Sequence, residues 1–89
     1  MSAPVNAGAQ REARAIATNA VLLTFIERFG TLPQQDDRLW RLDPFERLEL
    51  VGDIELKLGV AFEDADIEFL EHPSDLIERG TSILMRARR

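Results

Sequence analysis

The chain has 89 residues with a net charge of −5 at pH 7, and 45% of its residues are apolar. This apolar share excludes a chain too hydrophilic to fold, and the length allows one small domain. The absence of cysteine excludes a disulfide framework and a cysteine nucleophile, and the single histidine excludes a histidine-based metal cluster and a Ser-His-Asp triad. We therefore expect a protein that is not an enzyme and holds no metal.

The first predicted element is a flexible leader over residues 1–9, which are small and turn-forming. A helix is predicted over residues 10–29, because apolar residues recur there at helical spacing, and Gly30 is placed to end it. One apolar stripe of this helix includes Ile16 and Leu23, and further apolar residues make the arc wider than one ordinary buried face. The helix is therefore either central in a small bundle or also in contact with a partner.

The connection over residues 30–42 has a polar centre and ends in large apolar residues. Connections of this length in compact domains commonly pack down through their own apolar side chains. We expect Leu39, Trp40 and Leu42 to anchor the connection, with Trp40 in the core or in a lid over it.

The start of the next helix is the clearest local signal in the chain. Asp43 can accept a hydrogen bond from a free backbone N–H as the N-cap, and Pro44 suits the first helical position. The helix is predicted to run to Leu58, with Gly59 ending it.

The two faces of this helix are predicted to differ in polarity. The core stripe is expected to contain Leu48, Val51, Ile54 and Leu58, with Leu50 at its flank. The opposite face is expected to be an exposed, mostly negative strip of Glu46, Glu49, Asp53 and Lys57.

The remainder of the chain predicts a short third helix and a fourth helix. Residues 60–71 are acidic and are expected to form a loop and the short helix, and Ser74 is the predicted N-cap of the last helix. Gly80 leaves open whether that helix continues past it. No stretch alternates as a strand does, so the sequence predicts an all-α fold: a small four-helix bundle over residues 10–85, followed by a basic tail over 86–89.

Neither the acidic cluster of this region nor its histidine is predicted to form a metal-binding or catalytic site. The acidic cluster around residues 63–71 lacks the glycine and the terminal glutamate of a calcium-binding EF-hand loop, so acids near a helix N-terminus are the simpler interpretation. His72 has no nucleophile or orienting carboxylate at a recognisable spacing, so we interpret it as a structural turn residue.

The charge and hydropathy of the chain indicate which kinds of partner it can bind. Residues 31–80 carry fourteen acidic side chains against five basic ones, which repels nucleic-acid phosphates and suits a basic protein partner. No apolar run is long enough to cross a bilayer, and no cleavable signal sequence is recognisable. We expect a cytoplasmic protein that binds neither nucleic acid nor membrane.

Residues 39–84 resemble the acyl carrier protein family, which includes the peptidyl and polyketide carriers. The resemblance is carried by LWRLDPFERLELVGDIELKLGVAF, which starts at Leu39, and by FLEHPSDLIERG, which starts at Phe69. Carrier domains commonly show Leu-Trp or Leu-Phe before the second helix, Asp-Ser-Leu at its start, and a His-Pro-Ser-like entry to the last helix. The resemblance implies a four-helix bundle of the carrier type.

The sequence departs from the family at the residue that carries the cofactor. In carriers, the serine of Asp-Ser-Leu holds phosphopantetheine through a phosphodiester, and the thiol of that group carries the acyl or aminoacyl substrate. Here Asp43, Pro44 and Phe45 take the place of that motif, and Pro44 offers no hydroxyl. The resemblance therefore implies a carrier-like protein without phosphopantetheine or another cofactor.

The resemblance also implies a docking surface, because the second helix is the usual docking face of carriers. The implied docking residues for a basic-faced enzyme are Glu46, Glu49, Asp53 and Lys57. Any amphipathic helix needs such a solvated face, so the same strip also fits a helix without a partner.

We expect a non-catalytic module that docks onto an enzyme of acyl or aminoacyl metabolism, as a monomer or a weak homodimer. Two alternatives stay open. One is a true acyl or aminoacyl carrier of fatty-acid, polyketide or peptide biosynthesis that uses another attachment residue. The other is a homo-oligomeric helical structural protein built on the broad apolar arc of the first helix.

Overall fold

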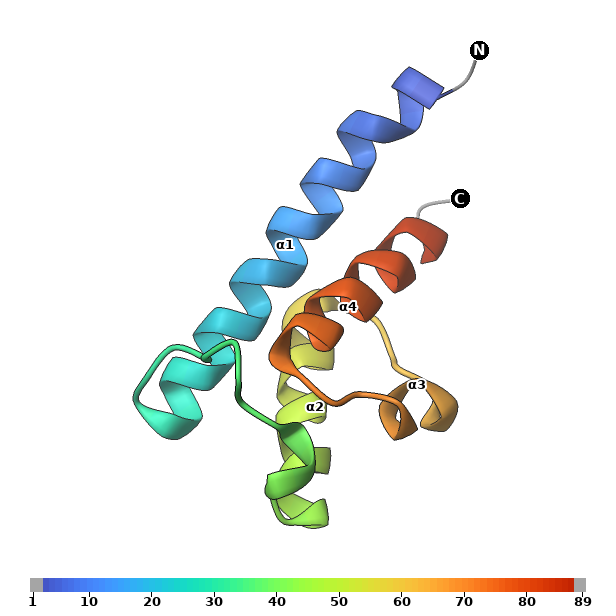
Figure 1. Cartoon of the computed structure of the whole chain (residues 1–89). Coiled ribbons are helices and arrows are strands. Elements are labelled where there is room, and N and C mark those ends of the chain that lie inside the picture. The colour runs from blue at the N-terminus through green and yellow to red at the C-terminus, as the bar shows by residue number, and fades with distance from the viewer. Residues whose placement is uncertain (1–2, 88–89) are drawn as a thin grey trace.

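Four α-helices and one short 3-10 helix make up the computed structural model, which describes residues 3–87 and the side chains of residues 7–87 (Figure 1). The α-helices are α1 (Ala3–Phe29), α2 (Pro44–Leu58), α3 (Asp64–Glu68) and α4 (Pro73–Ala87), and the 3-10 helix spans Leu39–Arg41. No strand occurs in the described residues. These findings confirm the predicted all-α bundle of four helices with a short third one.

Helix α1 begins earlier than its sequence pattern predicts. It starts at Ala3, so residues 3–9 of the predicted leader are helical, while residues 1–2 lie outside the described part of the chain. The segment is rich in alanine, which has the highest helix propensity, and Pro4 falls in the first turn, where its missing N–H leaves no helical acceptor unpaired. As predicted, α1 ends at Gly30, which adopts φ 74°.

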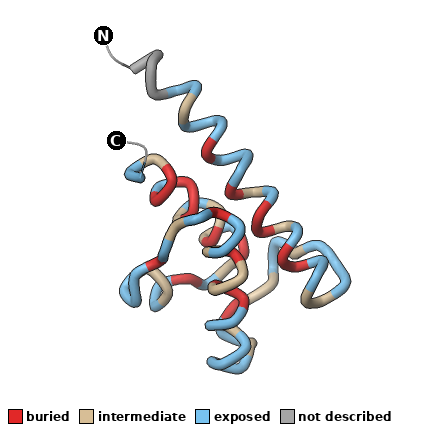
Figure 2. The backbone as a smooth tube through the Cα atoms, turned by 180° about the vertical axis from the view of Figure 1, so that it is seen from behind, coloured by how far each residue is buried: buried red, intermediate tan, exposed pale blue. Residues whose placement is uncertain are grey.

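The core lies where α1, α2 and α4 face one another (Figure 2). On α1 the buried stripe consists largely of small residues, whereas Ile16 and Leu23 of the predicted apolar stripe are exposed. Small side chains allow the backbones of α1 and α4 to approach closely. A Cβ added to Gly80 of α4 would lie 3.3 Å from the Cβ of Ala17. The buried stripe of α1 includes Ala13, Ala17, Ala20, Val21 and Phe25.

Helix α4 continues through Gly80 and includes Arg86, so the predicted tail begins in the helix, and its last two residues are not described. The prediction of Ser74 as N-cap is wrong, because the helix already begins at Pro73. His72 precedes the helix, and Asp75 at the third helical position reaches back as in a capping box: its Oδ2 accepts hydrogen bonds from the backbone N–H groups of His72 at 2.9 Å and Glu71 at 3.0 Å.

Helix α2 has the predicted bounds. Asp43 Oδ1 accepts a hydrogen bond of 2.9 Å from the Phe45 N–H, and Gly59 ends the helix in the left-handed region at φ 70°. The predicted core stripe is wrong at one position, because Leu50 is fully buried while Leu48 is 58% exposed. At 3.6 residues per turn, the stripe through Val51, Ile54 and Leu58 is flanked more closely by Leu50 than by Leu48.

The connection before α2 is anchored by Leu39, which is buried and whose N–H donates to the Glu71 carbonyl oxygen at 2.7 Å. Leu42 is partly buried against the core. The expected core or lid role of Trp40 is wrong, because this side chain is 59% exposed, with the Arg41 guanidinium 5.7 Å from its ring centroid. In a 3-10 helix successive side chains point about 120° apart, so Leu39 and Trp40 cannot both face the core.

Candidate docking site on α2

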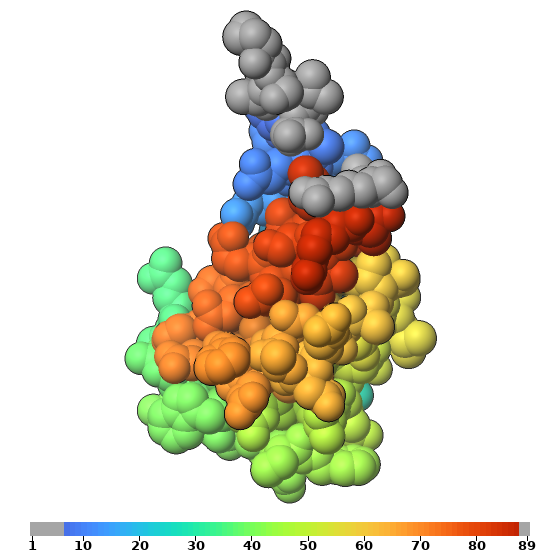
Figure 3. Space-filling view, turned by 90° about the vertical axis from the view of Figure 1, so that its right-hand side faces the viewer, coloured from blue at the N-terminus to red at the C-terminus, as the bar shows by residue number. Residues whose placement is uncertain are grey.

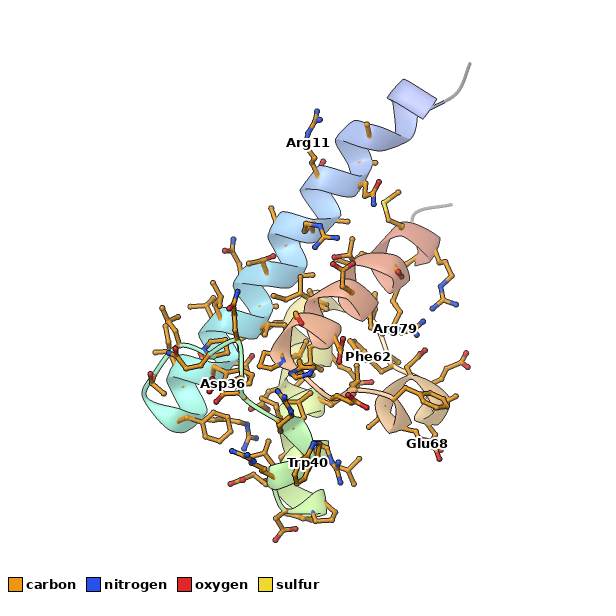
Figure 4. All side chains as sticks on the ribbon, in the orientation of Figure 1. Arg11, Asp36, Trp40, Phe62, Glu68 and Arg79 are labelled. Carbon is orange, nitrogen blue, oxygen red and sulfur yellow. The ribbon has the colours of Figure 1, made fainter. Side chains whose placement is uncertain are left out.

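The residues that align with the carrier attachment motif lie at one end of the molecule, at the start of α2. Asp43, Pro44 and Phe45 are all exposed, and Trp40 lies at the same end (Figure 4). Asp43 caps the helix and Pro44 takes its first position, so both have a structural use. Neither Pro44 nor Phe45 offers a hydroxyl or another nucleophile to which a phosphopantetheine group could be attached.

An open groove lies between the start of α2 and α3, which are neighbours on the surface (Figure 3). Its volume is about 440 Å³, and its walls combine apolar side chains with charged ones of both signs. None of these lining residues carries a hydroxyl or thiol. The groove is lined by Pro44, Arg47, Leu48, Asp64, Ile67 and Glu68.

Most of the predicted docking strip pairs with α1. Arg28 of α1 donates to Asp53 Oδ2 at 2.7 Å and lies 3.6 Å from Glu49 Oε1, and Lys57 Nζ lies 2.7 Å from Glu27 Oε1. The hydrogen bond to Asp53 raises the pKa of Arg28; burial opposes this effect, and the charges of Asp53 and Glu49 add to it. The strip is therefore in large part the polar seam between α1 and α2.

The four predicted docking residues consequently differ in their availability. Asp53 and Lys57 each make a short ion pair, whereas Glu49 makes only the longer contact with Arg28 and keeps about half of its side chain exposed. Glu46 is exposed and has no ion-pair partner within the described residues. Glu46 and Glu49 are thus the two carboxylates of the strip that a partner could reach most readily.

The sequence prediction missed a second apolar face on α2. Phe45 is 69% exposed and Leu56 is 83% exposed, and Leu48 lies between them on the same side of the helix. A Cβ built on Gly52 would meet no atom within 4 Å, so this face is open at its middle. The spacing of three, four and four residues was a readable signal in the sequence. We call this face the outer stripe of α2; it consists of Phe45, Leu48, Gly52 and Leu56.

The acidic cluster near α3 has structural partners. Asp66 Oδ2 accepts a hydrogen bond from the Glu63 N–H at 3.0 Å, and Asp66 Oδ1 lies 3.3 Å from Arg79. Among residues 3–87, no group of three His, Asp or Glu side chains is placed to hold a metal ion. No helix in this part of the chain has the length and hydropathy that a membrane span requires.

Comparison of the chain with protein-family models, with curated proteins and with solved structures finds no match. Membership of the carrier family therefore stays a prediction from the resemblance of residues 39–84.

Proposed function

We propose that this protein is a non-catalytic, acyl-carrier-like interaction module that docks through α2 onto an enzyme of acyl or aminoacyl transfer. The observation that carries the proposal is the outer stripe of α2, which exposes three large apolar side chains that the core does not use. A contiguous exposed apolar patch with a polar rim is typical of a protein interaction site. The all-α fold and the exposed Asp43-Pro44-Phe45 segment at the start of α2 are consistent with the resemblance to carriers.

The charges beside the outer stripe favour a basic-faced partner. Glu46 and Glu49 lie on the same helix and stay exposed. The two basic residues of α2 are Arg47 and Lys57, and Lys57 is already paired with Glu27 of α1. A partner with Lys or Arg around an apolar centre would pair with these carboxylates while its apolar side chains cover Leu48 and Leu56. The docking set we propose is therefore the outer stripe of α2 together with Glu46 and Glu49.

A comparison of partner-binding variants tests this docking set. The enzymes encoded beside the gene are the probes, because carriers are often encoded next to the enzymes that they serve, and titration calorimetry measures their affinity. Leu48→Gln and Leu56→Gln are each expected to weaken binding about tenfold or more, as exposed anchors do when they become polar. Leu23→Gln, on the exposed side of α1, is the matched control and should leave the affinity unchanged. Undiminished binding by the α2 variants would place docking elsewhere.

The proposal includes the loss of phosphopantetheine attachment, because Pro44 has no hydroxyl to form the phosphodiester. Incubation with coenzyme A and a promiscuous phosphopantetheinyl transferase, followed by intact-mass measurement, tests this part. The wild-type protein should keep its mass, whereas Pro44→Ser should gain one phosphopantetheine. A gain by the wild type would favour the alternative of a true carrier with another attachment residue. An unmodified Pro44→Ser variant would contradict the resemblance to carriers.

A homo-oligomeric helical protein is the second candidate, and one observation favours it. Ile16, Leu23 and Ile26 of α1 are exposed, although they are large and apolar. A second copy of the chain could cover them. Sedimentation over a range of concentrations distinguishes the candidates, because a protein that stays monomeric at high concentration removes the oligomer.

A further inference from the structure

The Nδ1 atom of His72, just before α4, contacts two groups in the segment between α1 and α2. It cannot form hydrogen bonds with both groups in the same protonation state. His72 Nδ1 lies 2.9 Å from Arg38 Nη1 and 3.1 Å from the carbonyl oxygen of Asp37. A guanidinium nitrogen can only donate a hydrogen bond, and a carbonyl oxygen can only accept one. Nδ1 must therefore be unprotonated to accept from Arg38, and it must carry a proton to donate to Asp37.

We propose that His72 is a proton-operated latch on this connection. In the neutral ring with its proton on Nε2, Nδ1 accepts the hydrogen bond from Arg38. When a second proton binds to Nδ1, two positively charged donors face each other, so Arg38 leaves and Nδ1–H donates to the Asp37 carbonyl oxygen. Both protonation states thus have a hydrogen-bond partner in place, as a two-state element requires.

The groups around His72 confine the change to side chains. Asp75 of α4 accepts a hydrogen bond from the backbone N–H of His72 through Oδ2, and this bond needs no proton from the ring. The backbone hydrogen bond from Leu39 to Glu71, 2.7 Å long, also needs no proton from the ring. Arg38 keeps a second contact, since its Nη1 lies 3.1 Å from the Asp36 carbonyl oxygen. The charged residues in contact with His72 are thus Arg38, through its guanidinium, Asp37, through its carbonyl oxygen, and Asp75, through its contact with the His72 backbone.

The latch lies shortly before the start of α2. Protonation of His72 adds one positive charge and frees the guanidinium of Arg38, two residues before the exposed Trp40. If docking occurs as proposed above, acidification should weaken the attraction of a basic partner to this end of the molecule. Only this consequence depends on the proposed function, because the latch itself is a property of the isolated chain.

Nitrogen-detected NMR of the isotopically labelled protein, without any partner, tests the latch. At a pH where His72 is neutral, Nδ1 is expected to show the chemical shift of an unprotonated ring nitrogen, with the proton on Nε2. Acidification should give a protonated Nδ1 and a simultaneous change in the Arg38 guanidinium signal. A neutral ring with its proton on Nδ1 would overturn the proposal.

Arg38→Met provides a second, independent readout. In this variant no guanidinium donates a hydrogen bond to Nδ1. The proton of the neutral ring should therefore lie on Nδ1 instead of Nε2, where it donates to the Asp37 carbonyl oxygen. Arg41→Met removes the same charge one turn later and should leave the tautomer as in the wild type. An unchanged tautomer in Arg38→Met would also overturn the latch. Because neither measurement involves a partner, failure here is distinguishable from failure of docking.

Discussion

The contact between α1 and α4 and the outer stripe of α2 use residue size in opposite ways. Between α1 and α4, the small residues Ala17 and Gly80 bring the two backbones close together. On the outer stripe, Phe45, Leu48 and Leu56 extend into solvent. Helix α2 nevertheless supplies a full core face on its other side. The difference teaches that one apolar face of α2 meets the needs of the core, which leaves the other available for a contact outside the chain.

The largest expected change in stability comes from replacing a leucine on the buried face of α2 by alanine, compared with the same replacement on the exposed face. Leu50→Ala should lower the free energy of unfolding by about 3 kcal/mol, because it removes a fully buried side chain and leaves a cavity. Leu48→Ala, two residues earlier on the outer stripe, should change it by no more than about 0.5 kcal/mol. Urea unfolding followed by circular dichroism measures both. Equal losses would contradict the assignment of the two faces.

The close approach of α1 and α4 is tested by replacing Gly80 with valine and comparing it with the same replacement at Gly52. Gly80→Val should destabilise the fold by about 2 kcal/mol, because an added Cβ already lies 3.2 Å from Leu58 Cδ1 and 3.3 Å from Ala17 Cβ, and valine adds two further methyl groups. Gly52→Val places the same side chain in open space on the outer stripe, and its stability should stay within about 0.5 kcal/mol of the wild type. Thermal unfolding compares the pair, and tolerance of Gly80→Val would show that the contact is loose.

The smallest expected effect is at the edge of the α1–α4 contact, where Arg14 Nη1 and Glu78 Oε2 lie 2.8 Å apart. The hydrogen bond from Arg14 lowers the pKa of Glu78; burial opposes this, and the charge of Arg14 adds to it. A lowered folded-state pKa stabilises the protein above the ordinary pKa of the carboxyl, and this stabilisation is lost as the pH falls through the folded-state value.

Glu78→Gln should therefore be slightly less stable than the wild type at neutral pH, and the difference should vanish in acid. Both side chains are largely exposed, so screening by solvent and salt keeps the effect small. Denaturant titrations at a series of pH values measure the difference, with the exposed Glu68→Gln on α3 as the control. A difference that persists in acid would assign the effect to packing and not to charge.

Much of the fold was predictable because helix ends are encoded locally. Asp43 and Pro44 start α2 and Gly59 ends it, and each does so through its own backbone conformation or hydrogen bond. Gly30 ends α1 in the same way. The early start at Ala3 was missed because the leader shows no apolar periodicity, although alanine favours a helix without it.

The choice of buried face was not predictable to the same degree. Periodicity fixes which residues share a face, but α1 carries one broad apolar arc and α2 carries two apolar faces, and only the packing of the helices decides which part is buried. On α1 the smaller residues are buried and Leu23 is exposed. At the candidate site, the sequence correctly places Pro44 at the first position of a helix, but it cannot reveal that Arg28 lies beside Asp53. That pairing depends on how α1 and α2 are oriented.

The position of Pro44 separates the stability of this fold from its covalent chemistry. The backbone N–H of a first helical residue has no acceptor within its own helix, so serine and proline are both acceptable there, and Asp43 supplies the cap in either case. Two chains that differ only at residue 44 should therefore fold alike, while only one could be modified at a hydroxyl. Gain or loss of a covalent attachment at this position would then need a single substitution and no compensating change elsewhere in the bundle.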